Sequence, residues 1–343
     1  MTNTLLIGWK NETTYGVNAF TVPASDQAYS FGDYLDKHEI PLPGNEIPLT
    51  PVYRLGQVLP VNLVEGAKNV QFTLTFCPLH GYPWKWALGA VTGGATAVFK
   101  SAKGTTTDLT LPSITIYVET EFGDHLYIKG CIVESLDFYG DKDLPMQFTL
   151  RILGAEVETG TALTNKTLIN PADLGILKAW GWDMTDTALI GVKDVDPFDD
   201  PDVGGIQRVF LHVENILKKR FGGSPSKVVQ VQKTGEAVVI TFDVASTAAT
   251  VDNEIIKACR AAETNDFQYK WTCVVGGVTY YWILNVNNLK LRSVKGAQKV
   301  GSGDPPVYIL SGQASYDSTR SDVDTTYLKN AVAVKIVDGH TYA

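Results

Sequence analysis

The sequence predicts a mainly β (α+β) protein that contains two copies of one domain, each flanked by a short helix. Residues 111–153 hold three runs in which apolar and polar residues alternate, the pattern of strands with one buried face. A similar succession of runs returns in residues 237–312. A length of 343 residues suits two ordinary domains.

The three runs between Leu111 and Leu153 are separated by turn sequences at 122–125 and 140–143. The second run is interrupted at Gly130, where we expect a bulge, because glycine inside a strand marks an irregular or closely approached backbone. The third run alternates strictly from Met146 to Ile152. These runs predict a three-stranded antiparallel meander.

The case for an internal repeat rests on residues 127–138 and 280–291, which share an aromatic opening, a central valine and a final pair of apolar positions. Upstream, residues 70–76 are matched by 237–243 in the same order. We therefore place the first domain at 1–157, a linker at 158–173 and the second domain at 174–343. The start of the second copy stays open, because 181–182 and 189–193 both resemble 6–10.

The remaining elements of the first copy follow from shorter patterns. We expect strands at 4–10, 58–64 and 69–76, and a short aromatic helix within 81–91. Pro83 suits the first helical turn. Residues 92–108 are predicted to form a loop or a weak hairpin.

Residues 21–60 carry six prolines and little alternation, so they are not expected to form a central strand. Long irregular segments in compact domains are usually binding loops or arms. We predict an extended arm that contacts another subunit, with a wandering surface loop as the alternative. Its candidate residues are Pro41, Pro43, Pro48 and Pro51.

In the second copy we expect a strand at 209–213 and a hairpin of 228–232 and 236–244 that turns over 233–235. Residues 251–262 have the periodicity of an amphipathic helix. A last strand at 331–337 lies outside the repeat and is predicted to pair with another chain.

The charge balance limits the possible partners. Charged residues make up 19% of the chain, below the usual quarter, which suggests that other subunits cover much of the surface. A net charge of −8 argues against a protein that grips nucleic acid, because that affinity comes mainly from Lys and Arg. No secretory leader or bilayer-spanning run is visible, so we expect assembly in a cytoplasm.

No motif in the sequence points to catalysis, and we predict neither an enzyme nor a bound cofactor or metal. The four cysteines lack metal-ligand spacing and are expected to be free core residues. Five aspartates between Asp194 and Asp202 could offer oxygen ligands to Ca²⁺, but the loop lacks the glycine and glutamate of the common calcium loop. A solvated acidic loop is favoured there, and cation binding is left open.

Four stretches resemble the tail tube proteins of long-tailed viruses of bacteria and archaea. They are Gly8–Gly16, the aromatic helix before Gly93 and Gly94, Leu111–Ile116 and Tyr127–Leu136. The resemblance covers roughly residues 5–157 and reaches the second half only through the internal repeat. It implies that each domain is a tail-tube-type β-sandwich or barrel of two sheets flanked by a helix, and that rings stack into a hollow tube that conducts DNA.

The resemblance also implies a virion protein of the tail, assembled in the host cytoplasm, without a membrane or a cofactor. Its implied partners are its own copies and the tape-measure, tail-terminator and baseplate proteins, with DNA passing through without specific binding. Family tubes are usually hexamers of single domains. Two domains per chain therefore predict a homotrimer whose six domains mimic a hexamer.

We expect polar and acidic residues to line the lumen, because DNA must slide past without the binding that Lys and Arg would create. The first candidates are Glu119, Glu134 and Asp137, on outward phases of the meander. Two alternatives remain: another injection-tube or baseplate component, and a β-sandwich carbohydrate-binding or adhesive protein.

Overall fold

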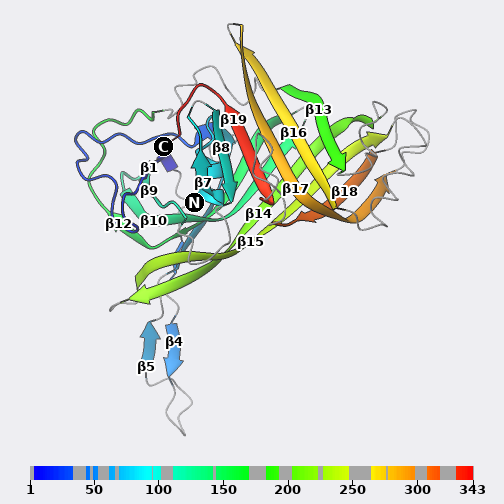
Figure 1. The fold of residues 1–343 in the computed structure, drawn as a ribbon. Coiled ribbons are helices and arrows are strands. Elements are labelled where there is room, and N and C mark those ends of the chain that lie inside the picture. The colour runs from blue at the N-terminus through cyan, green and yellow to red at the C-terminus, as the bar shows by residue number, and fades with distance from the viewer. Residues whose placement is uncertain are drawn as a thin grey trace.

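Long antiparallel strands dominate this computed structural model of the chain (Figure 1). The structure describes residues 4–33, 44–46, 49–52, 62–65, 69–94, 96–101, 111–141, 144–169, 183–192, 203–222, 227–246, 264–275, 277–297, 307–316 and 330–342. The prediction of a mainly β protein is confirmed.

The first half contains the one helix of the described residues and twelve strands. They are β1 (Thr4–Asn11), β2 (Gly32–Asp33), β3 (Gly44–Glu46), β4 (Leu49–Val52), β5 (Asn62–Glu65), β6 (Asn69–Pro78), α1 (Tyr82–Leu88), β7 (Gly89–Thr92), β8 (Thr96–Ser101), β9 (Ile114–Thr120), β10 (His125–Asp141), β11 (Leu144–Gly154) and β12 (Glu156–Thr159).

The second half contributes seven described strands, several of them long. They are β13 (Asp183–Val192), β14 (Val203–Gly222), β15 (Lys227–Ser246), β16 (Thr264–Val275), β17 (Val278–Ala297), β18 (Val307–Ala314) and β19 (Val332–Val337). The helix expected at 251–262 lies outside the described residues.

The predicted meander of β9, β10 and β11 is confirmed. The bulge at Gly130 is confirmed too, because pairing with β9 skips from Ile128 to Cys131 and Gly130 has a φ of 62°. This bulge divides β10 between two sheets. Its first part pairs with β9 and β12, and its second part pairs with β11 and β14.

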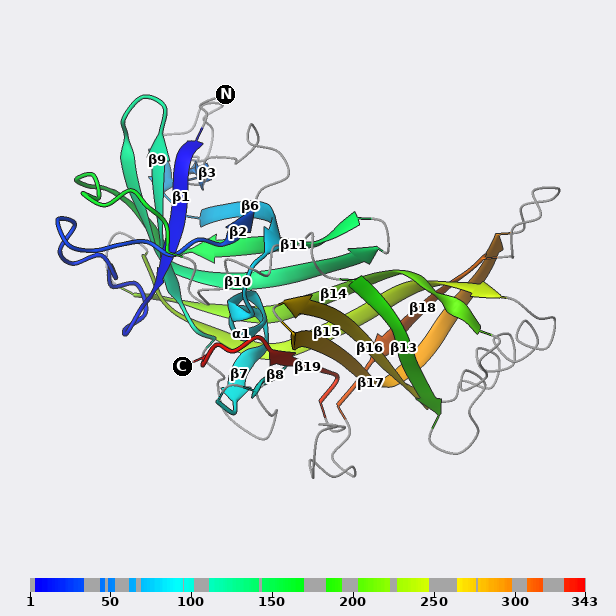
Figure 2. The same cartoon turned by 90° about the horizontal axis from the view of Figure 1, so that it is seen from above.

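The larger sheet runs through both halves of the chain in the order β3, β6, β11, β10, β14, β15, β18 and β17. The junction between the halves is the ladder of β10 with β14, from Ser135 opposite Glu214 to Asp141 opposite Arg208 (Figure 2). A second junction pairs β8 with β19. Among the described residues, the two halves are therefore joined by backbone ladders at these two places.

One hydrophobic core extends across this junction. The buried cluster includes Phe148 and Leu150 from the first half and Val213, Ile240 and Trp282 from the second. The rings of Phe148 and Trp282 are stacked with their centroids 6.3 Å apart. The division into two tandem domains stays a prediction, and the described parts of the two halves share one core.

Two expectations for the second half are wrong. Residues 233–235 do not turn a hairpin, because β15 continues through them and pairs with β14 along nearly its full length. The ladder shifts register there, between Ile216 and Leu217 of β14, so a turn-like sequence forms a bulge. The last strand, β19, pairs with β17 and β8 of its own chain rather than with another chain.

The described parts of the predicted linker and arm are partly packed onto the first half. Leu163 is buried, and the backbone N–H of Ser30 donates to the carbonyl of Ile169. Phe31, within the predicted arm, is fully buried. The two-stranded sheet of β4 and β5 projects from the body in Figure 1. Pro51 lies in β4, whereas Pro41, Pro43 and Pro48 lie outside the described residues.

The C-terminal tail, residues 338–342, returns to the start of helix α1. Tyr342 is 3% exposed, and its hydroxyl accepts the N–H of Gly81 at 2.7 Å and donates to Asp338. Burial raises the pKa of the Asp338 carboxyl and of the Tyr342 phenol. The tail therefore closes the N-terminal end of a helix that lies 261 positions earlier in the chain.

His80, next to that helix, is fully buried. Burial lowers its pKa to about 4, so the imidazole is neutral at neutral pH. Its Nε2–H donates to the carbonyl of Ser30 at 2.8 Å, and its Nδ1 accepts the N–H of Tyr82 at 3.3 Å. Only the neutral ring satisfies both contacts.

Candidate functional site

One face of the larger sheet is buried in the core, and its opposite face, which we call the open face, is not. The alternation is strict from Met146 to Ile152 of β11, where Phe148, Leu150 and Ile152 are buried and Gln147, Thr149 and Arg151 are partly or fully exposed. It ends at Leu153, which is buried with Ile132 in a second, smaller hydrophobic cluster. Around the junction the open face comprises Gln71, Thr73 and Thr75 of β6, Gln147, Thr149 and Arg151 of β11, Glu134, Asp137, Tyr139 and Asp141 of β10, Arg208, Phe210, His212 and Glu214 of β14, Thr241 and Asp243 of β15, and Ser311 of β18. Towards its β17 edge the ladder register adds Ile309 and Gln313 of β18 and Lys290, Ser293 and Lys295 of β17.

Polar contacts cross from strand to strand over the open face. On β10, the Glu134 carboxylate accepts from Gln71 Nε2 at 2.6 Å and pairs with Arg151 Nε at 3.0 Å. The hydroxyls of Thr75 and Thr149 lie 3.0 Å apart. Threonine and ion pairs of this kind stabilise neighbouring strands in register.

A second group of contacts lies across the junction between the halves. Arg208 Nε donates to Asp141 at 3.1 Å, and its Nη1 lies 3.8 Å from Asp243. His212 Nδ1 contacts Asp137. Burial raises the pKa of Asp243, and Asp141 adds to the shift, whereas Arg208 opposes it.

The open face is acidic around the junction between the halves. It carries five carboxylates there, on Glu134, Asp137, Asp141, Glu214 and Asp243, against the guanidiniums of two arginines. Both arginines are held in ion pairs with these carboxylates. The β17 edge of the same face adds the exposed lysines Lys290 and Lys295. A polyanion passing the junction would therefore meet few cationic groups that could release its counterions, and the β17 edge would supply two.

The structure brings together two of the three predicted lumen residues. Glu134 and Asp137 lie on the open face of β10. Glu119 lies on β9 in the other sheet, 6% exposed, and forms an ion pair with Lys166. Residues 161–169 cover that part of β9, since the Tyr117 hydroxyl accepts the N–H of Leu163 at 3.5 Å.

Sequence reasoning missed the contribution of the second half to this face. Arg208 and Asp243 come from β14 and β15, which only the three-dimensional strand order places beside β10. The strict alternation on β11 did indicate that Gln147, Thr149 and Arg151 share an outward phase. No local pattern shows which other strands extend that phase into one surface.

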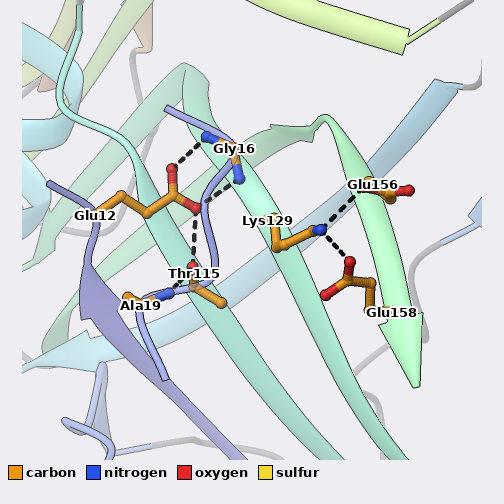
Figure 3. Close-up of polar contacts among 8 residues, drawn as sticks. Glu12, Gly16, Ala19, Thr115, Lys129, Glu156 and Glu158 are labelled. Carbon is orange, nitrogen blue, oxygen red and sulfur yellow. Dashed lines mark hydrogen bonds and ion pairs between the residues drawn. The ribbon is translucent and has the colours of Figure 1, made fainter. Parts of the chain in front are cut away.

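The carboxylate of Glu12 links the turn after β1 to β9 and to the bulge of β10 (Figure 3). One carboxylate oxygen accepts from Gly16 N at 2.9 Å and Ser113 Oγ at 2.7 Å. The other accepts from Thr115 Oγ1 at 2.8 Å and from Gly130 N, in the bulge of β10, at 2.7 Å. A carboxylate offers about four lone-pair positions, so this group is saturated.

Beside it, Lys129 joins β10 to β12 (Figure 3). Its ammonium lies 3.0 Å from Glu156 and is also paired with Glu158. Its side chain is 8% exposed. Although burial alone would lower it, the pKa of Lys129 is raised, because both carboxylates favour the charged form.

Asn215 extends the junction between the halves into the core. This β14 side chain is 2% exposed, and its Nδ2 donates to the carbonyls of Ala87 and Val133 at 3.0 Å each. Ala87 lies in the last turn of α1, whose carbonyls lack helical partners. The second half therefore fixes the end of the helix of the first half.

The described residues contain no group of three or more His, Cys, Asp or Glu side chains placed to hold a metal ion. The loop from Asp194 to Asp202 lies outside them. No helix in the described ranges has the length and hydrophobicity needed to cross a bilayer.

A family model described as phage tail tube protein matches residues 2–203, more than half of the chain. The chain belongs to this family. Tail tube proteins are structural components of the virion tail, not enzymes, and they assemble with their own copies into a tube. A sequence comparison with curated proteins finds no match. The match covers β1 to β13, so the open face of this tail tube protein includes strands beyond it.

Proposed function

We propose that this chain forms rings that stack into a hollow tube, and that the open face lines the lumen through which DNA passes to the host cell. The observation that carries the proposal is the continuity of the open face across the β10–β14 junction, with paired arginines and an excess of carboxylates around that junction. A lumen needs such a surface, because DNA held by unpaired cations would not slide.

The proposed ring is a homotrimer whose six half-chains stand in for six single domains. Both halves contribute strands to the open face, which supports this stoichiometry over a hexamer whose second half decorates the outside. The tape-measure, tail-terminator and baseplate proteins are the further partners that this role requires. Assembly in the host cytoplasm belongs to the same proposal.

The ring proposal predicts three chains per ring. Negative-stain images of the purified protein are expected to show rings or tubes, and the mass of a soluble ring is expected to equal three chains. Residues 1–160 alone are expected to form no tube, because β14 and β15 are missing from the open face. Rings of six chains, or tubes formed by residues 1–160, would contradict this stoichiometry.

The hairpin of β4 and β5 is the part of the predicted arm that projects from the body, and we propose that it contacts the next ring (Figure 1). Replacing residues 49–65 with a short glycine-serine linker is expected to leave rings of normal mass that no longer stack into tubes. As a matched control, inserting the same linker after Gly123, in the exposed β9–β10 turn, should leave tubes intact. Tubes of normal length from the hairpin variant would reject this role.

A further inference from the structure

Strand β17 repeats the irregularities of β10. Pairing of β10 with β9 skips from Ile128 to Cys131, and pairing of β17 with β16 skips in the same way from Val286 to Leu289. The skipped residues include Gly130, with a φ of 62°, and Asn288, with a φ of 51°. Asn288 is the sole non-glycine residue with a positive φ in the described part of the chain, and asparagine tolerates that region best. The two bulges therefore correspond.

A second bulge follows at the same spacing in both strands. In β10 the ladder with β11 shifts between Val133 and Ser135. In β17 the ladder with β18 shifts between Leu291 and Ser293. Bulges occupy defined positions in a strand and are not random defects. Because both bulges match in spacing, Ser135 of β10 corresponds to Ser293 of β17.

The neighbouring strands correspond as well. β6 pairs with β11 as β15 pairs with β18. Val70, which lies opposite Gly154, therefore corresponds to Val238, which lies opposite Ala314. β1 borders β9 as β13 borders β16, and β12 borders β10 as β19 borders β17.

The correspondence leaves two strand edges unmatched. At 135–141, β10 pairs with β14 on the side away from β11. In the equivalent stretch of β17, residues 293–297, the described residues form a ladder with one strand, β18. In the first half, β3 pairs with β6 as β14 pairs with β15, because Asn45 lies opposite Val70 and Val213 opposite Val238. β3 therefore occupies the place of β14.

We propose that β3 of one copy pairs with β17 of the next copy, as β14 pairs with β10 inside each chain. This inference rests on the ring proposed above and names the edges that close it. Within the chain, Glu214 lies opposite Ser135 and His212 opposite Asp137. Transferring this register places Glu46 opposite Ser293, Asn45 opposite Val294 and Gly44 opposite Lys295, in antiparallel order.

The physical argument is that exposed strand edges carry unpaired backbone groups and tend to gain a partner strand. The two edges belong to different surfaces of the chain, so the contact is heterologous, and repeating it closes a ring when the rotation permits. The junction within the chain and the proposed junction between chains also share residue types. Glu214 lies opposite Ser135 within the chain, and Glu46 is placed opposite Ser293 between chains. Each ring would then alternate junctions within chains and between chains.

Disulfide trapping tests this register. Separate Glu46→Cys and Ser293→Cys chains are mixed, allowed to assemble and oxidised. Directly opposed residues of an antiparallel pair have Cβ atoms about 4.5–5.5 Å apart, close enough for a disulfide after small adjustments. The mixture is expected to give a two-chain species on a non-reducing gel, and neither variant alone is expected to give it.

The matched control mixes Asn45→Cys with Ser293→Cys, because neighbouring residues in a strand point to opposite faces of the sheet and should not bridge. Gly44→Cys with Lys295→Cys provides a second opposed pair in case one variant fails to fold. Absence of the two-chain species from both opposed pairs would overturn the inference, as would a disulfide within one doubly substituted chain. Images of the unsubstituted protein test the proposed function separately. Tubes in those images, combined with no two-chain species on the gel, would support the proposed tube and reject the pairing of β3 with β17.

Discussion

Replacing Glu12 with glutamine is expected to lower the free energy of unfolding by about 2–3 kcal/mol, because hydrogen bonds to charged groups are worth about 1.5–3 kcal/mol each and stranded donors cost about as much. Glutamine keeps the shape of the side chain but turns one acceptor oxygen into an NH₂ group. That group would face two of the four donors around Glu12: the N–H of Gly16 with the Ser113 hydroxyl, or the Thr115 hydroxyl with the N–H of Gly130. Urea titration followed by circular dichroism measures the change.

Glu121→Gln is the matched control, because Glu121 is exposed in the β9–β10 turn. It is expected to change stability by less than about 0.5 kcal/mol, as surface substitutions usually do. Equal losses in the two variants would show that the four contacts of Glu12 do not stabilise the fold. A loss confined to Glu12 would assign the stability to the network that joins β1, β9 and the bulge of β10.

Deleting residues 338–343 is expected to have the larger effect, about 3–5 kcal/mol, the range for removing a large buried aromatic side chain. The deletion takes away the Tyr342 ring, which packs edge-on against Phe99 and Tyr82 with centroids 5.0 Å away in each case. It also leaves the N–H of Gly81 without its acceptor. Thermal unfolding of the full chain and the truncated chain measures the loss.

Tyr342→Phe separates the two contributions, since it keeps the ring and removes the hydroxyl. It is expected to cost about 1–3 kcal/mol, the range for leaving buried polar partners unsatisfied. Tyr316→Phe, at a site that is 41% exposed, serves as the control and is expected to be nearly neutral. A truncated chain that unfolds at the same temperature as the full chain would contradict the assigned role of the tail.

Much of the fold could be predicted because its signals are local. The alternation on β9, β10 and β11 specified the meander, and a glycine inside a strand pattern located the bulge at Gly130. The same local reasoning failed at residues 233–235. Lys233-Thr234-Gly235 has the composition of a turn, yet Lys233 is 5% exposed and paired with Glu236 inside a continuous strand.

The candidate site was predicted in part for the same reason. Glu134 and Asp137 were found from the outward phase of one strand. Glu119 also lies in the polar phase of its strand, but Lys166 and its neighbours cover that surface. Arg208 and Asp243 needed the strand order, which depends on pairings between distant segments that no periodicity encodes. Register and neighbour choice are tertiary properties, so a single sequence gives little access to them.

The return of the C-terminal tail to helix α1 has a consequence for how the chain acquires its structure. Gly81 and Tyr342 are separated by 261 positions, and β8 and β19 pair over a similar interval. Contacts of such high sequence separation slow folding, because the entropy of closing a long loop must be overcome before they form. Until residues 332–342 have been synthesised, β8 therefore lacks its neighbour β19, and the N–H of Gly81 lacks its acceptor, the Tyr342 hydroxyl. During that interval the edge of β8 is open to pairing with another chain, so self-association before completion is a risk of this order of synthesis.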